Sequence, residues 1–193
     1  MIDLPIVFSA EASVRIAEVK AHDDYGHRKW SDDILELVRC EVRDHYRRVQ
    51  HLTCVYCLNP VSVRSAAGAP VEHIAPKSMY LSYMFEPLNL CVCCPDCNEY
   101  KRNREVHTDP PIIGRVPAAY PNESDKFRIV HPHFDNYSEH IRRAGILYIP
   151  LDAKGSYTFY VCHLARYVEE LGISEDLFND LAAVMQRHQF HAR

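Results

Sequence analysis

Apolar residues recur at helical spacing between residues 31 and 49. They fall on one side of a helical wheel and stand at Ile34, Leu37, Val38, Val42, Tyr46 and Val49. Because such steps place side chains on one face of an α-helix, a helix is predicted here. Ser31 is expected to cap its start, and Asp32 and Asp33 suit the positive end of the helix dipole. A shorter helix is predicted from Glu11 to Ala21.

The longer helix also carries arginines at four-residue steps, at Arg39, Arg43 and Arg47. This spacing places the three side chains on one flank. Such a flank is either a solvated face or a ridge that contacts phosphates, and the sequence leaves both interpretations open.

Two β-rich runs in residues 145–164, GILYIPLDAKGSYTFYVCHL, predict a β-hairpin that turns at Asp152–Gly155. The chain then returns to helix, which Gly172 is expected to end, and Ser174 is placed to cap a last helix. Ahead of the hairpin, residues 107–135 predict an ordered loop arm or a tether, because their prolines interrupt helices and central strands.

The length of 193 residues and the hydrophobic content of 47% suit one well-cored domain, or a small module with helices around it. We expect an N-terminal helical region at 1–50, a cysteine-rich module at 51–106, and a region at 107–193 in which the proline-rich arm, the hairpin and C-terminal helices pack on the module. No apolar run is long enough to span a membrane, and an acid stands where a signal peptide would be basic. A cytoplasmic protein is therefore expected.

The charge balance limits how the chain could bind nucleic acid. Lys and Arg number 22 against 26 Asp and Glu, which gives a formal net charge of -4. Proteins that coat nucleic acid are usually basic, because neutralising phosphates supplies most of the non-specific affinity. Contact with nucleic acid must therefore come from local patches, or from a partner that brings the substrate.

The cysteines are the strongest chemical signal in the chain. In a reducing compartment, two C-x-x-C pairs indicate thiolate-bound zinc rather than disulfides. The pairs are CVYC at Cys54 and Cys57, and CPDC at Cys94 and Cys97. Together they offer the thiolates of one tetrahedral, structural zinc site.

On spacing alone, the register of the second pair stays open. Cys91 and Cys94 also form a C-x-x-C pair, and Cys93 could substitute in a shifted one. Two further cysteines, Cys40 and Cys162, lie outside the pattern and are expected to be ordinary buried residues.

The segment from the first pair to just past the second resembles the HNH, or ββα-metal, nucleases whose finger is braced by a four-cysteine zinc site. The family pattern joins an acid-His pair followed by Ile and Pro, a central Asn-Leu, and a C-x-x-C-N-x-x-K run. The matching residues are Glu72-His73-Ile74 with Pro76, Asn89-Leu90, and Cys94, Cys97, Asn98 and Lys101. Asn89 and Asn98 lie nine positions apart, as in the family. The resemblance therefore implies Cys94 and Cys97 as ligands and leaves Cys91 and Cys93 as core residues or neighbours of the site.

This resemblance implies an α+β fold, with a ββα finger built on structural zinc and surrounded by helices and a hairpin. It implies Glu72 and Asn98 as ligands of a catalytic Mg²⁺ or Mn²⁺ ion, because these ions prefer oxygen donors. His73 is implied as the general base that activates water, and Asn89 as the residue that holds its imidazole by a hydrogen bond. Lys101, one turn after Asn98, is implied as a catalytic residue that reaches a phosphate.

Basic residues near the finger are expected to extend the contact with nucleic acid, at Lys101, Arg102, Arg104, Arg142 and Arg143. Lys77, in the loop after Pro76, is expected at the surface rather than in catalysis. A further cluster could hold a second metal or aim a histidine at the phosphate, at His131, His133, Asp135 and His140. Because its spacing is irregular, packing or surface positions are the simpler interpretation of this cluster.

The runs FRIVHPHFDNYSEHI and GILYIPLDAKG are similar to the segment after the finger in HNH subunits of Septu-type and retron-linked anti-phage systems. Those subunits pair with an ATPase, which could deliver DNA to an acidic chain. The resemblance thus implies a metal-dependent DNA endonuclease, the effector of a defence system. The alternatives are a catalytically silent zinc module that binds nucleic acid or protein, and a nuclease of structured RNA. The oligomeric state stays open.

Overall fold

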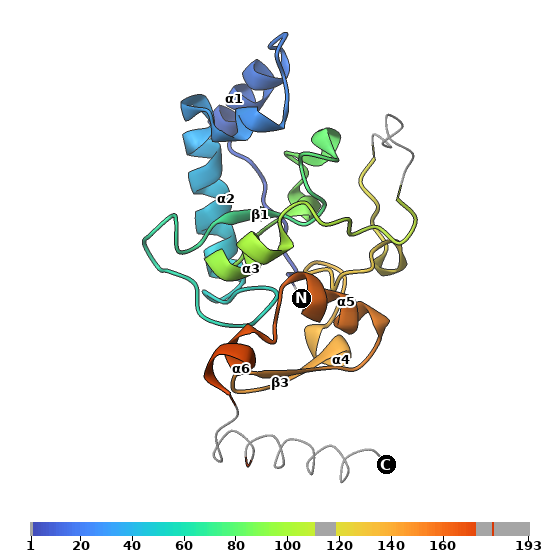
Figure 1. Cartoon of the computed structure of the whole chain (residues 1–193). Coiled ribbons are helices and arrows are strands. Elements are labelled where there is room, and N and C mark those ends of the chain that lie inside the picture. Colours follow the sequence, from blue (N-terminus) through green and yellow to red (C-terminus); the bar gives the residue numbers. More distant parts are fainter. Residues whose placement is uncertain (1, 111–118, 173–178, 180–193) are drawn as a thin grey trace.

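The computed structural model describes residues 2–110, 119–172 and 179, which form short helices and two small antiparallel sheets (Figure 1). The α-helices are α1 (Ala10–Lys20), α2 (Glu36–Val49), α3 (Pro95–Lys101), α4 (Tyr137–His140), α5 (Ala153–Val161) and α6 (Arg166–Leu171). The strands are β1 (Val71–His73), β2 (Leu90–Val92), β3 (Ile141–Ala144) and β4 (Leu147–Pro150). Short 3-10 helices span His27–Ser31, Asp33–Leu35, Leu81–Tyr83, Pro87–Asn89 and Ser124–Lys126. The described chain is therefore α+β.

The two N-terminal helices form where the apolar pattern predicts them. Ser9 caps α1, because its side chain accepts a hydrogen bond from the Ala12 amide at 3.1 Å. Each helix buries one face, formed in α1 by Ala12, Ile16 and Val19 and in α2 by Val38, Val42 and Tyr46. Both predicted helices are confirmed.

The start of α2 differs from the prediction. Ser31 ends a 3-10 helix, and the N-cap position of α2 is Leu35, which makes no side-chain capping bond. The two 3-10 helices ahead of α2 bury Trp30 and Leu35. Burial of two large apolar side chains contributes about 3 kcal/mol or more, whereas a serine cap contributes about 1 kcal/mol. Tertiary packing therefore decides where α2 begins.

The arginine flank of α2 is neither a solvated face nor a phosphate ridge. Arg39 pairs with Glu36 at 2.6 Å between Nη2 and Oε2. Arg43 and Arg47 are buried, and Arg47 donates to the Ser65 carbonyl at 2.7 Å. These side chains are used for contacts within the protein.

The cysteine-rich region folds as a hairpin followed by a helix. β1 and β2 pair in antiparallel register, with Glu72 opposite Cys91 and His73 opposite Leu90. α2 packs against both strands, and α3 begins shortly after β2. This order brings the acid-His pair and the second cysteine pair into one small unit.

The C-terminal hairpin is confirmed, but its turn lies earlier than predicted. β3 and β4 turn at Gly145, whose φ of 58° favours glycine, and the expected second strand is α5 instead. Asp152 explains the difference, because its Oδ1 accepts from the Gly155 amide at 2.7 Å and caps the helix. Gly155 also permits a close approach, since a Cβ there would lie 2.0 Å from the His140 carbonyl oxygen.

The end of the described chain follows the prediction. α6 ends at Leu171, and Gly172, with a φ of 72°, is its C-cap. The helix expected after Ser174 lies outside the described residues. Within the described part of 107–135, the only helix is the short 3-10 turn Ser124–Lys126, as expected for a proline-rich loop arm. No helix in the described part of the chain has the length and apolar character needed to cross a membrane.

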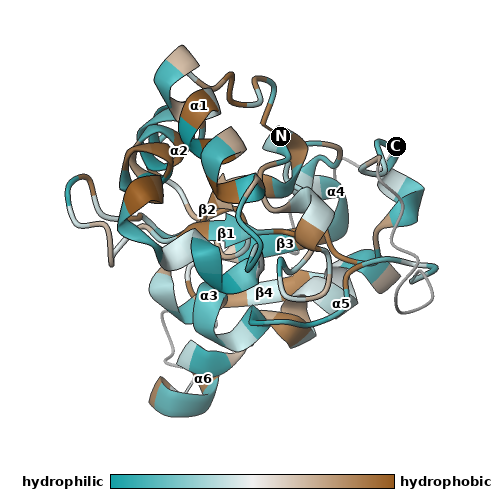
Figure 2. Ribbon diagram, turned by 90° about the horizontal axis from the view of Figure 1, so that it is seen from above, coloured by the Kyte–Doolittle hydropathy of each residue, from teal (hydrophilic) through white to brown (hydrophobic). Residues whose placement is uncertain are grey.

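One hydrophobic core runs through all three regions of the sequence. It includes Val42 from the N-terminal region, Leu90 from the cysteine-rich region and Ile129 from the C-terminal region. In the view of Figure 2, helices surround the two small sheets. The flanking regions therefore pack on the cysteine-rich segment and help to fix its loops.

Candidate metal centre and adjoining pocket

Four buried cysteines converge where the turn after α2 meets the start of α3. Their sulfur atoms all lie within 4.8 Å of one another, in Cys54, Cys57, Cys94 and Cys97. Four thiolates at this spacing fit one tetrahedral zinc ion, the common arrangement of a structural site. The four cysteines predicted as ligands therefore lie together as a metal site requires, and Cys91 and Cys93 are buried outside this group.

The local sequence CPDC explains how the second pair is held. Cys94 is the N-cap of α3, and its Sγ accepts from the Cys97 amide at 3.4 Å. Pro95 follows at the start of the helix, where a missing N–H leaves no hydrogen bond unmade. Both sulfurs are thereby brought to the same site.

The two cysteines outside the pattern differ from each other. Cys162 is buried, as expected. Cys40 is half-buried on α2, and its Sγ donates to Glu36 Oε1 at 3.3 Å, so the expectation of full burial is wrong for this residue.

Protonation of the cluster depends on burial and on contacts between the sulfurs. Burial raises the pKa of the Cys54 thiol, and hydrogen bonding with Cys54 lowers the pKa of Cys94 to about 7. Because a metal binds thiolates, a cluster with a buried, protonated thiol must release protons when metal enters.

Side chains from the C-terminal region brace the first cysteine turn. The carbonyls of residues 56, 57 and 58 accept hydrogen bonds from Tyr137 Oη at 3.0 Å, Tyr148 Oη at 2.7 Å and Arg143 Nη1 at 2.6 Å, in that order. This bracing fixes the backbone around Cys57 independently of the sulfur atoms. It also corrects the expectation for Arg143, because its guanidinium is engaged inside the protein and not free for nucleic acid.

The other arginines expected to contact nucleic acid differ in exposure. Arg102 and Arg104 are exposed, Arg102 pairs with Glu99, and Arg104 lies 5.9 Å from the Tyr160 ring. Arg142 is half-buried on β3. The exposed part of the predicted track is therefore limited to Arg102 and Arg104.

A pocket beside α3 collects three of the predicted catalytic and metal-binding side chains. Glu72 and His73 of β1 and Asn98 of α3 line it together. His27 and Trp30, from the 3-10 helix ahead of α2, complete one wall. Sequence reasoning missed these two residues, and only the rarity of tryptophan in this chain could have drawn attention to one of them.

His73 is buried, and its ring is fixed. Nε2 lies 3.0 Å from the Met84 carbonyl oxygen, which can only accept, so Nε2 carries the proton and Nδ1 the lone pair. Burial holds the pKa of His73 well below its usual 6.5. Trp30 packs edge-on against the imidazole, with ring centroids 4.5 Å apart. His73 is therefore a neutral imidazole at neutral pH, and Nδ1 can accept a proton.

Asn89 does not hold this imidazole, contrary to expectation. Its buried amide bonds the backbone instead: Nδ2 donates to the Ala75 and Tyr83 carbonyls at 3.0 Å each, and Oδ1 accepts from the Ala75 amide at 2.6 Å. These bonds shape the loop between β1 and β2, which carries the Met84 carbonyl. Asn89 therefore fixes His73 only indirectly, through the loop.

Lys101 cannot reach a phosphate as expected, because it is fully buried. Its Nζ lies 2.6 Å from Glu72 Oε1 and donates to the His73 carbonyl at 3.1 Å. Burial raises the pKa of Glu72, and the charge of Lys101 acts against that rise. Lys101 is therefore a counter-ion that orients Glu72.

Lys77 lies in the pocket rather than on the open surface. It is half-buried and shares the pocket wall with Glu72 and His73. Burial lowers the pKa of Lys77, and the charge of Glu72 acts in the opposite direction. A lysine beside a carboxylate and an imidazole suits an anionic ligand, so the expectation of a plain surface position is wrong.

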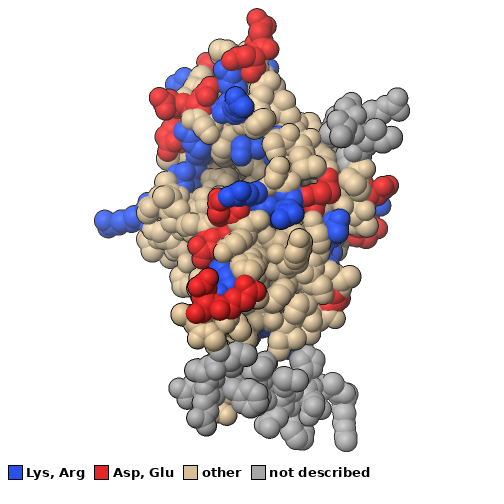
Figure 3. Space-filling view, viewed as in Figure 1, with Lys and Arg blue, Asp and Glu red and all other residues tan. Residues whose placement is uncertain are grey.

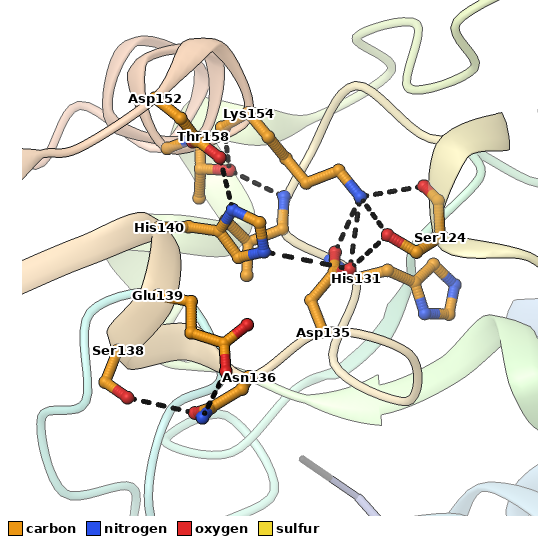
Figure 4. A network of polar contacts seen from close by, with 12 residues as sticks. Ser124, His131, Asp135, Asn136, Ser138, Glu139, His140, Asp152, Lys154 and Thr158 are labelled. Atoms are coloured by element: carbon orange, nitrogen blue, oxygen red, sulfur yellow. Dashed lines mark hydrogen bonds and ion pairs between the residues drawn. The ribbon is translucent and has the colours of Figure 1, made fainter.

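The histidine cluster that precedes β3 is a structural network (Figure 4). Asp135 accepts from the His131 amide at 2.6 Å and pairs with Lys154 at 2.9 Å, while His140 lies 3.8 Å from Asp135. His133 Nε2 bonds the backbone of β2 at 2.9 Å. In the described part of the chain, the four cysteines are the only group of three or more His, Cys, Asp or Glu side chains placed to hold a metal, and this cluster is not among them. The interpretation of this cluster as packing is therefore the one that the contacts favour.

The metal centre and the pocket are thus defined by their side chains. No protein-family model matches this chain, and no curated protein matches it. What the pocket can do must follow from the chemistry of its carboxylate, imidazole, carboxamide and ammonium groups.

Proposed function

We propose that the protein is a metal-dependent endonuclease of the HNH type, which hydrolyses phosphodiester bonds of DNA. The observation that carries this proposal is the meeting of Glu72, His73 and Asn98 in one pocket. The order of β1, β2 and α3 beside a four-cysteine cluster supports a ββα-metal finger braced by zinc. A module that only bound nucleic acid would not need a carboxylate, an imidazole and a carboxamide in one pocket.

The oxygen donors of the pocket fit a hard divalent cation. Glu72 Oε1 pairs with Lys101, and within the described residues Oε2 accepts no hydrogen bond. Asn98 adds a carboxamide oxygen from α3. Glu72 and Asn98 would hold Mg²⁺ or Mn²⁺, which supplies stabilisation of the negative charge that develops on the phosphate.

His73 would act as the general base. Because the Met84 carbonyl fixes Nε2 as the protonated nitrogen, Nδ1 can take a proton from the attacking water. Because the pKa of His73 is lowered by burial, the ring stays unprotonated at neutral pH and is free to accept a proton. Lys77, rather than the buried Lys101, would contact a phosphate oxygen at the pocket wall.

Surface charge supports delivery of the substrate by a partner. Basic and acidic side chains are interspersed on the face shown in Figure 3, and the net charge is -4. The affinity that comes from phosphate neutralisation is therefore small. We place the protein in the cytoplasm as the HNH subunit of an anti-phage system, with an ATPase subunit that delivers DNA. This assignment rests on the sequence resemblance.

One observation favours a second function, that of a silent zinc module that binds nucleic acid or protein. Lys101 already balances the charge of Glu72 in a buried pair, and such a pair can exist without any catalytic role. In that case the pocket would be a by-product of how α3 packs on β1. The two functions differ in whether DNA is cut.

Plasmid nicking separates these functions. Zinc-loaded protein is incubated with supercoiled DNA and Mg²⁺ or Mn²⁺, alone and with the candidate ATPase. His73→Ala is expected to lower the cleavage rate about 100-fold or more. The control His22→Ala removes an exposed histidine outside the pocket and should cleave as the wild type does. Intact protein that binds DNA yet leaves DNA and structured RNA uncut with either metal would establish the silent module instead.

A further inference from the structure

The helix α6 carries a buried arginine that faces the four-cysteine cluster. Arg166 is 5% exposed, and its Nη2 lies 3.7 Å from Cys97 Sγ and 3.9 Å from Cys94 Sγ. Among the described residues, no other basic side chain makes a hydrogen-bond contact with a sulfur of the cluster. The proposed cleavage chemistry has no use for this residue.

Contacts on its other sides fix the guanidinium in place. Nη1 donates to the carbonyls of Cys162 and His163, both at 3.1 Å, where α5 turns into α6. Nε lies 3.3 Å from Asp96 Oδ2, inside the second cysteine turn. The Tyr167 ring lies 4.8 Å from the guanidinium carbon. Because the side chain is held from several directions, its charge is a fixed part of the sulfur site.

Electrostatics explains the use of an arginine at this position. Four thiolates around one divalent ion carry excess negative charge. Burying such charge is costly unless an opposite charge and hydrogen-bond donors accompany it. A guanidinium stays protonated and offers several donors in a rigid plane, so it can face two sulfurs and a carboxylate at once.

We propose that Arg166 is the counter-ion of the metal–thiolate centre and that it links metal binding to the docking of α6. Such coupling is reciprocal: metal strengthens the docking of α6, and docked α6 strengthens metal binding by the same factor. Loss of the metal therefore loosens α6 in preference to helices that do not touch the cluster. The inference rests on the cysteine cluster and does not depend on nuclease activity.

Metal release measures the first half of this linkage. Zinc-loaded variants are mixed with excess chelator, and transfer of zinc to a chromogenic dye is followed in time. Arg166→Gln is expected to release zinc about 10- to 100-fold faster than the wild type, the usual range for a residue that supports metal ligands. Arg166→Lys keeps the positive charge but loses the planar guanidinium with its paired donors, so its rate of zinc release should fall between those of the wild type and Arg166→Gln. The control Arg39→Gln removes an arginine that pairs with Glu36 and contacts no sulfur of the cluster, and it should release zinc at the wild-type rate.

The outcomes of this assay are decisive in both directions. Release from Arg166→Gln at the wild-type rate would overturn the proposal. So would release from Arg166→Lys as fast as from Arg166→Gln, because a retained charge would then have no effect. A Co²⁺-loaded sample adds a spectroscopic readout: its sulfur-to-metal absorption band should shift in Arg166→Gln and stay in place in Arg39→Gln.

Hydrogen exchange measures the second half and uses the wild-type chain, so it does not depend on a variant that folds. Amide exchange is compared in α6 and in α1 before and after zinc is removed. α6 should exchange faster once zinc is removed, because metal and docked α6 stabilise each other, while α1, which lies outside the cluster, should change far less. Equal changes in the two helices would show general unfolding and would refute a specific link through Arg166.

Discussion

Replacing Lys101 with methionine tests the buried pair next to the pocket. Lys101→Met keeps the length of the side chain but removes the charge that balances Glu72. The two side chains are 0% and 6% exposed, and Nζ lies 2.6 Å from Oε1. Breaking a buried pair costs about 3–5 kcal/mol, and the His73 carbonyl also loses a donor, which adds about 1 kcal/mol. We therefore expect the free energy of unfolding to fall by about 4–6 kcal/mol.

Urea unfolding of the zinc-loaded protein measures this loss, with the fluorescence of Trp30 as the signal, because this only tryptophan packs on His73. The double variant Lys101→Met/Glu72→Gln should recover about 1–3 kcal/mol, since it leaves no unpaired charge. Lys126→Met, which removes an exposed lysine from a 3.7 Å surface pair, should unfold as the wild type does. A Lys101→Met protein within about 1 kcal/mol of the wild type would refute the reasoning, because only surface pairs contribute so little.

Three further predictions concern the cluster, the base and the loop. Cys57→Ser should lose zinc and unfold the cysteine-rich module, because structural zinc contributes on the order of 10 kcal/mol. Zinc content and melting temperature check this, with Cys40→Ser as the control. Unchanged values in Cys57→Ser would contradict the four-cysteine assignment. Burial lowers the pKa of His73, so at mildly acidic pH the folded protein binds fewer protons at this residue than the unfolded chain does. The contribution of the neutral ring to stability is therefore complete above pH 6.5 and is lost as the pH falls toward the lowered pKa of the folded state. The stability difference between wild type and His73→Gln, measured in urea, should therefore shrink below pH 6.5, and a constant difference would count against a lowered pKa. Asn89→Ala leaves the buried amide and carbonyl of Ala75 without partners and should cost about 2 kcal/mol or more in urea unfolding. An unchanged midpoint would mean that water replaces the Asn89 side chain.

Features that depend on short-range patterns could be predicted from the sequence. The helical periodicity around Val42 located α2, because burial of one face repeats along a helix. The two C-x-x-C pairs located the sulfur cluster, because two knuckles suffice for a tetrahedral site. The acid-His pair and Asn98 line one pocket as the resemblance implied, although the sequence carried no information on what else lines it.

Features that depend on distant partners could not be predicted. The resemblance places Lys101 at the substrate and Asn89 at the imidazole, yet Lys101 pairs with a carboxylate on β1 and Asn89 bonds a loop backbone, contacts that only the fold creates. The aromatic residues of α5 favour a strand, whereas the cap at Asp152 stabilises the helix that the structure shows. Arg166 gave no local signal, because its partners lie about seventy residues earlier in the chain.

The hydrogen bonds to the carbonyls of residues 56–58 determine the smallest fragment of this protein that can be expected to fold on its own. A fragment cut at residue 106 would keep all four sulfurs of the cluster and the acid-His pair, but it would lack Tyr137, Arg143 and Tyr148. Its first cysteine turn would have to be ordered by the metal alone, at the cost of the backbone entropy that these side chains remove in the full chain. Anyone who transplants the cysteine-rich segment into another scaffold must carry α4 and the C-terminal hairpin with it.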